Sequence, residues 1–229
     1  MSGGILISVV DGRHLNGPAR VLASGPDFRE VAVPGSAVVS SGGNIFFESG
    51  FDIDIRHARR WIPIVKRICS ALLDISVISK ALEGYSFVKP RYVENFRDAV
   101  LLCDRSALES SIRELTGLGP GLTPSGDDFL AGFISAGHFF RGRRQFDFFL
   151  ENAKINPGAT NLISAYYLEY ALEGRVSETI SNIVLSTAAR DRALGSWLRV
   201  LLGAGATSGA DTLYGVLTAM EVFNACESC

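Results

Sequence analysis

The chain contains few of the residues that mark metal-dependent, disulfide-stabilised or membrane proteins. Its 229 residues include 4 cysteines and 3 histidines, at spacings that fit neither a disulfide framework nor a zinc domain. Cys226 and Cys229 form a lone CxxC with no second pair beside it. The longest apolar stretch, residues 129–140, is interrupted by glycines and polar residues and is shorter than the roughly 20 residues that span a bilayer. We therefore expect neither a structural metal nor a membrane segment.

The charge balance is also unremarkable in sign and distribution. Lysine and arginine total 22 against 24 acidic residues, which leaves a formal net charge of -2. Such a chain has no general positive field for a nucleic-acid backbone, so we expect no nucleic-acid partner. The first ten residues have no basic start and only about six consecutive apolar residues, which is not typical of a targeting signal. These features predict a cytoplasmic protein.

Hydrophobic patterning divides the chain near residue 50. Residues 1–50 contain short β-branched or alternating runs separated by glycine- and proline-containing turns, whereas residues 51–229 show apolar residues at helical spacing. The expected strands are Ile5–Val10, Ala19–Ala23, Val31–Val33, Ala37–Ser40 and Asn44–Phe47. We expect an α+β protein in which a small N-terminal antiparallel β sheet or barrel packs on a larger C-terminal part of seven or eight α-helices. The two parts should form one compact unit.

One segment after this boundary carries a conflicting signal. Residues Asp54–Leu73 have helical spacing, but Pro63 lies among them. Because proline cannot continue a helix interior, we expect either a kink there or a helix start near Trp61.

The most informative feature is an internal repeat. Residues 118–132 read LGPGLTPSGDDFLAG and residues 202–215 read LGAGATSGADTLYG. When Pro124 is skipped, the two strings share nine residues, of which seven are Gly, Ser, Thr or Asp. An apolar stripe at helical spacing follows each string. We therefore interpret both as glycine-rich loops that open core helices.

Each repeat combines backbone freedom with polar side chains at an expected helix start. Backbone N–H groups there lack helical partners, which suits an anion such as phosphate or carboxylate. Ser125 with Asp128, and Ser208 with Asp211, resemble capping boxes, and Pro124 would suit the first helical position if Thr123 capped the helix. A purely structural role, with tight turns and ordinary caps, is the alternative. The predicted substrate-binding residues are Gly119, Gly121, Thr123, Ser125, Gly126, Gly203, Gly205, Thr207, Ser208 and Gly209.

The acidic residues of the repeats are the predicted catalytic residues. Asp127, Asp128 and Asp211 would repel a phosphate unless something bridged the charges. They could hold Mg²⁺ through their oxygens or accept hydrogen bonds from an amide or ureido group. Mg²⁺ is thus a candidate cofactor, although no cofactor is certain. A nucleotide site is unsupported, because neither loop ends in GK[ST] and no GxGxxG occurs in a βαβ context.

The repeats resemble the AllH family of oxamate carbamoyltransferase subunits. The resemblance rests on GLGPGLTPSGDDFLAG at 117–132 and GATSGADTLYG at 205–215, with a weaker element that includes Thr160 and Ser164. It implies phosphorolysis of oxalurate to oxamate and carbamoyl phosphate in allantoin breakdown. It also implies that companion subunits of the same pathway take part. Self-association is a further open possibility.

Under this resemblance the substrate is a small molecule with both a carboxylate and a ureido group, and phosphate is the second reactant. The aspartates would accept its N–H donors while a helix start holds an anionic group. Two alternatives remain open. One is a non-catalytic ligand-binding or scaffold subunit of an acyl-transfer complex, and the other is a Mg²⁺-dependent phosphotransferase.

Overall fold

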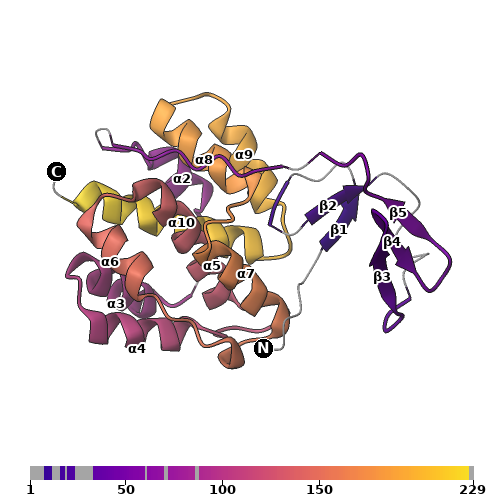
Figure 1. The fold of residues 1–229 in the computed structure, drawn as a ribbon. Coiled ribbons are helices and arrows are strands. Elements are labelled where there is room, and N and C mark those ends of the chain that lie inside the picture. The colour runs from indigo at the N-terminus through magenta and orange to yellow at the C-terminus, as the bar shows by residue number, and fades with distance from the viewer. Residues whose placement is uncertain are drawn as a thin grey trace. The chain divides into compact units, whose positions relative to one another are not determined.

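The computed structural model describes residues 8–11, 16–18, 20–23, 33–59, 61–69, 72–85 and 88–226. The chain divides into two compact units, Met1–Ile62 and Pro63–Cys229, and each is described by itself. Figure 1 shows strands in the first unit and helices in the second. The predicted α+β class is confirmed, with a small antiparallel sheet near the N-terminus and a larger helical C-terminal part.

The N-terminal unit contains two small sheets. Strands β1 (Ser8–Asp11) and β2 (Arg20–Ala23) pair with each other. Strands β3 (Val38–Ser41), β4 (Asn44–Phe47) and β5 (Asp52–Asp54) form an antiparallel sheet in the order β3-β4-β5. The expectation of antiparallel pairing is confirmed for the second sheet and wrong for the first, because β1 and β2 run parallel. The described strands form these two sheets rather than a closed barrel.

Local backbone chemistry explains the β3–β4 hairpin. Gly42 and Gly43 connect the strands with φ values of 59° and 81°. Two consecutive residues with positive φ are typical of the type I′ turn, whose twist matches that of paired strands. The expected strand Val31–Val33 lies outside the described residues except for Val33, which is not in a strand.

The described residues that follow the N-terminal sheet form no helix, so the expectation of a helix over Asp54–Leu73 is wrong. None of the described residues from Ile55 to Ile75 is helical. Within the second unit, residues of the helical part provide hydrogen-bond partners to this segment at two positions. The amide of Ile68 donates to the carbonyl of Phe139 at 2.8 Å, and Asn224 bonds both backbone groups of Leu73.

The second unit consists of α-helices joined by short connections. Nine are found in the described part of the chain, one or two more than expected. They are α2 (Ser76–Ala81), α3 (Pro90–Leu101), α4 (Arg105–Leu115), α5 (Ser125–Gly137), α6 (Arg144–Asn152), α7 (Leu162–Leu172), α8 (Glu178–Ala189), α9 (Leu194–Leu202) and α10 (Ser208–Ala225). Two 3₁₀ turns, η1 (His138–Phe140) and η2 (Pro157–Ala159), complete the unit. None of the described helices is long and apolar enough to span a membrane.

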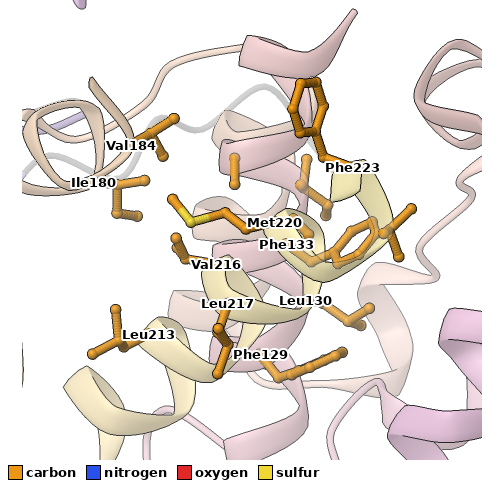
Figure 2. Packing of buried hydrophobic residues seen from close by; sticks show 14 of the residues in the cluster. Phe129, Leu130, Phe133, Ile180, Val184, Leu213, Val216, Leu217, Met220 and Phe223 are labelled. Atoms are coloured by element: carbon orange, nitrogen blue, oxygen red, sulfur yellow. The ribbon is translucent and has the colours of Figure 1, made fainter. Parts of the chain in front are cut away.

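Helices α5 and α10 form the centre of this unit. Their apolar stripes are fully buried and pack together with Ile180 and Val184 of α8, as Figure 2 shows. Phenylalanines add edge-to-face contacts, for example Phe96 with Phe133 at 4.8 Å between ring centroids. The two helices that begin at the glycine-rich loops are thus the most deeply buried helices of the core, which fixes the position of both helix starts.

Candidate functional site

The two repeats converge in space. The hydroxyl of Thr123, before α5, lies 2.6 Å from the hydroxyl of Ser208, the first residue of α10. Past the opposite end of α5, Phe140 stacks on Phe223 of α10 at 4.5 Å. Helices α5 and α10 therefore run in the same direction, with their N-terminal turns together.

Two glycines allow this close approach. A Cβ at Gly132 would overlap the carbonyl oxygen of Thr212, and a Cβ at Gly215 would overlap the carbonyl oxygen of Phe129. The repeat alignment pairs Gly132 with Gly215 and Phe129 with Thr212, so the two helices exchange equivalent contacts. The last glycine of each repeat therefore serves helix packing.

The predicted capping boxes are wrong. Helix α5 begins at Ser125 and α10 begins at Ser208, so both serines are the first helical residues rather than caps. The N-cap residues are Pro124 and Thr207, and neither helix has a side-chain cap hydrogen bond. Pro124 is accordingly the cap and not the first helical residue. Capping therefore does not explain why each repeat has a serine at this position and an aspartate three positions later.

Asp128 lies between the two helix starts. Burial raises its pKa to about 7, while the hydroxyls of Ser208 and Thr123 oppose this shift and the negative charges of Asp211 and Asp127 add to it. Its Oδ2 atom is buried and has no hydrogen-bond partner. A carboxyl group with this pKa is partly protonated at neutral pH, so it can donate or accept a proton.

Asp211 occupies the matching position on α10. The residue is 1% exposed, and neither carboxylate oxygen has a hydrogen-bond partner. Burial raises its pKa, and the hydroxyls of Ser125 and Thr207 lie close enough to oppose that shift, although no donor meets hydrogen-bond geometry at either oxygen. Each aspartate thus lies near a hydroxyl of its own loop and a serine of the other helix.

Asp127 has a different environment. It is buried, and its Oδ1 accepts a hydrogen bond from the amide of Gly117 at 2.8 Å, while its Oδ2 accepts one from the hydroxyl of Thr160. Both oxygens are therefore occupied by protein donors. Its position on α10 is taken by Ala210, so the second repeat lacks this connection.

The loops before the helices differ more than their sequences suggest. Gly119 (φ 117°) and Gly205 (φ 68°) both have left-handed conformations and lie against the first serine of the following helix. Gly203, which the sequence alignment pairs with Gly119, is right-handed with φ -79°. Gly119 and Gly205 are therefore the structurally equivalent glycines, although Gly119 lies six residues before Ser125 and Gly205 lies three before Ser208. Gly121 (φ 95°) has no such equivalent in the shorter loop.

Most of the amides at the helix starts already have acceptors, contrary to the expectation of unpaired N–H groups. Gly126 donates to Leu118 and Gly209 donates to Ala204, each at 2.9 Å. The amides of Asp127, Asp128 and Asp211 also bond to backbone carbonyls. A Cβ at Gly126 or Gly209 would overlap a carbonyl of the preceding helix, so both glycines serve packing. An anion would find few free amides here.

Metal binding receives no support from the acidic residues. In the part of the chain that the structure describes, no group of three or more His, Cys, Asp or Glu side chains could hold a metal ion. The predicted catalytic residues Asp128 and Asp211 lie in one cluster with Thr123, Ser125, Thr207 and Ser208, which we call the paired-aspartate cluster.

A comparison with known families gives a match over the same part of the chain. The model of the family described as oxamate carbamoyltransferase subunit AllH matches residues 115–220. This AllH region includes both helix starts and every residue of the paired-aspartate cluster, and it excludes the N-terminal unit. No solved structure matches the chain.

The AllH region also contains supporting residues that the sequence does not reveal. Thr160 is 33 positions from Asp127, and Gly117 is placed by its φ of 74° against the carbonyl of Ala159. Ser164 likewise donates to the carbonyl of Leu122 at 3.5 Å. The start of α7 therefore supports the first loop. Only the presence of Thr160 and Ser164 in the weak middle element indicated their relevance.

Proposed function

We propose that this chain is a subunit of a carbamoyltransferase that interconverts oxalurate and phosphate with oxamate and carbamoyl phosphate. The single observation that carries the proposal is the meeting of two repeated helix starts, which puts Asp128 and Asp211 together with acceptor oxygens that no protein donor uses. The AllH match over the same residues supports this choice of reaction.

The paired-aspartate cluster suits the chemistry of a ureido substrate. In phosphorolysis, a phosphate oxygen attacks the carbamoyl carbon, and the bond from that carbon to the oxamate nitrogen breaks. The departing nitrogen then needs a proton. Asp128, with its pKa near 7, can supply that proton as a general acid and recover it in the reverse direction. Asp211 would accept hydrogen bonds from the substrate's N–H groups.

The other predicted residues take supporting roles in this proposal. The hydroxyls of Thr123, Ser125, Thr207 and Ser208 orient the two carboxyl groups and the substrate. Asp127 holds the first loop against Thr160 and Gly117, which positions Asp128 rather than contacting the substrate. Companion subunits supply the rest of the site, in accordance with the family's description as one subunit of the enzyme.

A non-catalytic ligand-binding or scaffold subunit is the second candidate. Most amides at the two helix starts already donate to backbone carbonyls. The chain by itself therefore offers few donors to a phosphate, which favours this second candidate. In that case the cluster would bind a small ureido acid and organise the complex while another subunit performs the transfer.

The test is carbamoyl phosphate formation from oxalurate and phosphate by the assembled complex. Asp128→Asn should lower the rate by about 100-fold or more, because general acid–base groups contribute that much. Asp211→Asn should also lower the rate, because the substrate's N–H groups lose an acceptor, and both variants should still fold. Asp98→Asn, whose side chain is 61% exposed on α3, is the matched control and should retain the rate. Full turnover in both cluster variants would contradict the catalytic role and favour the scaffold function.

A further inference from the structure

Arginines gather at the turn between η1 and α6. Residues 141–144 read RGRR, and the guanidinium group of Arg67, from the segment before α2, packs on the glycine among them. A Cβ built at Gly142, whose φ is 90°, would overlap that guanidinium group. The hydrogen bond from the Ile68 amide to the Phe139 carbonyl joins the segment of Arg67 to η1. Glycine at position 142 therefore lets a guanidinium group from a distant segment lie directly on the turn.

The positive charge of this turn is only partly balanced. Arg67, Arg141 and Arg144 are exposed, and none of the ion pairs found among the described residues includes them. One carboxylate lies at the turn, because both oxygens of Asp147 accept from the amide of Gly142, each at 3.1 Å. Three guanidinium groups beside one carboxylate leave the turn with an excess of two positive charges.

The start of α6 adds hydrogen-bond donors to the same turn. Its N-cap residue Arg143 makes no side-chain cap and packs over the ring of Phe223, 4.8 Å from the ring centroid. Within the described ranges, no backbone carbonyl accepts from the amides of Arg144 and Gln145. A helix start favours negative charge, yet its first residue here is an arginine. Guanidinium groups and helix-start amides are all donors, so the ligand that fits them is an anion rich in acceptor oxygens.

We infer that Arg67, Arg141, Gly142 and Arg144, which we call the arginine turn, bind the phosphate group of a small ligand. A phosphate group carries close to two negative charges at neutral pH, which matches the excess charge of the turn, whereas a monocarboxylate carries one. The inference goes beyond the proposed function. Asp128 lies in the first turn of α5 and the arginine turn lies past its other end, which separates them by about 15–20 Å along the helix. A phosphate bound here is therefore not the one that attacks the carbamoyl carbon.

The experiment titrates inorganic phosphate into the full chain at low ionic strength. The backbone NMR signals of Gly142 and Arg144 should shift and saturate, and acetate at the same concentrations should leave them unchanged. Arg67→Gln combined with Arg144→Gln should weaken phosphate binding by about tenfold, because two charged contacts are lost. The control combines Arg105→Gln with Arg113→Gln on α4, which removes the same charge from two other exposed positions, and it should bind as the wild type does.

Glycerol 3-phosphate, titrated in the same way, distinguishes the two sources of a phosphate group. Tighter binding than that of inorganic phosphate supports a phosphate ester as the ligand, and weaker binding supports the free ion. Three results would overturn the inference. They are the absence of saturable shifts at the arginine turn, shifts of equal size with acetate, and equal loss of affinity in the two double variants. The wild-type signals test the site even if a variant fails to fold.

Discussion

The starts of α5 and α10 share one set of features and differ in another. Both have a serine at the first helical position, an aspartate three residues later and a glycine at the helix crossing. Only the first has a buried aspartate that bonds to a neighbouring loop, and its left-handed Gly119 lies three residues further from the first serine of the helix than Gly205 does. The shared residues form the cluster and the crossing, while the differing residues support one side of it.

The comparison distinguishes the residues that form the paired-aspartate cluster from those that only hold one of its loops. Each serine lies beside the aspartate of the other helix: Ser208 lies beside Asp128, and Ser125 lies beside Asp211. Each half of the cluster therefore depends on the other repeat. Asp127 and its counterpart Ala210 take no part in that exchange. We therefore expect substitutions of shared residues to affect both halves and substitutions of Asp127 to affect one.

The largest expected effect is at the helix crossing. Gly132→Val should prevent folding or lower the free energy of unfolding by more than about 3 kcal/mol, because its side chain would overlap the Thr212 carbonyl. Gly215→Val should do the same from the other helix. Gly195→Ala in α9 is the control, since its Cβ would have ample room, and it should be neutral or stabilising by about 1 kcal/mol. Urea denaturation measures all three.

A smaller effect is expected where the halves differ. Asp127→Ala makes the first half resemble the second and leaves the Gly117 amide and the Thr160 hydroxyl without their acceptor. The loss of two hydrogen bonds to a buried carboxyl group should cost about 2–4 kcal/mol. Asp98→Ala should stay within about 0.5 kcal/mol of wild type. Equal stabilities would show that the connection to Thr160 does not hold the first loop.

The protonation of Asp128 gives a pH-dependent effect. Its pKa rises from 3.8 to about 7 on folding, so between these values the folded state binds more protons than the unfolded state. Stability from this group is therefore present at low pH and is lost as pH rises towards 7, by up to about 1.4 kcal/mol per pH unit. Asp211 acts in the same direction.

Urea denaturation from pH 4 to pH 8 measures this slope. Asp128→Asn should make the slope shallower, and so should Asp211→Asn. The variant with the larger change in slope identifies the carboxyl group that takes up more protons on folding. Asp98→Asn should keep the wild-type slope. An unchanged slope in both cluster variants would mean that neither carboxyl group is protonated on folding.

The smallest effect concerns the serines. Ser125→Ala should cost less than about 0.5 kcal/mol, since this serine caps no helix. Ser177→Ala is the contrasting change, because Ser177 caps α8 by accepting from the amide of Ile180, and it should cost about 1 kcal/mol. Thermal unfolding of the two variants makes the comparison. A loss at Ser125 that persists when Asp211 is already replaced by Asn would restore the capping explanation.

The sequence predicted the class of fold and the residues of the cluster for physical reasons. Helical spacing of apolar residues reflects burial of one helix face, which holds for α5 and α10 regardless of distant contacts. It failed between Asp54 and Leu73, where the described residues form no helix and where Ile68 and Leu73 bond to Phe139 and Asn224 instead. The parallel pairing of β1 with β2 is likewise a contact between segments that strand propensity does not specify.

The sequence identified the residues of the site better than it predicted their hydrogen bonds and backbone conformations. The repeat identified Asp128 and Asp211, but the capping boxes were wrong, because Ser125 and Ser208 are the first helical residues and neither helix has a side-chain cap hydrogen bond. The support of Asp127 by Thr160 joins positions far apart in the sequence, and no local spacing encodes it. The true correspondence of Gly119 with Gly205 also depends on backbone conformation rather than on alignment.

The shared direction of α5 and α10 has an electrostatic consequence. Two neighbouring helices that start at the same end bring their positive macrodipole ends together, which favours negative charge in their first turns. The pKa values of Asp128 and Asp211 are nevertheless raised, with burial as the main cause. The loss of water around these two carboxyl groups therefore outweighs the field of both helix ends.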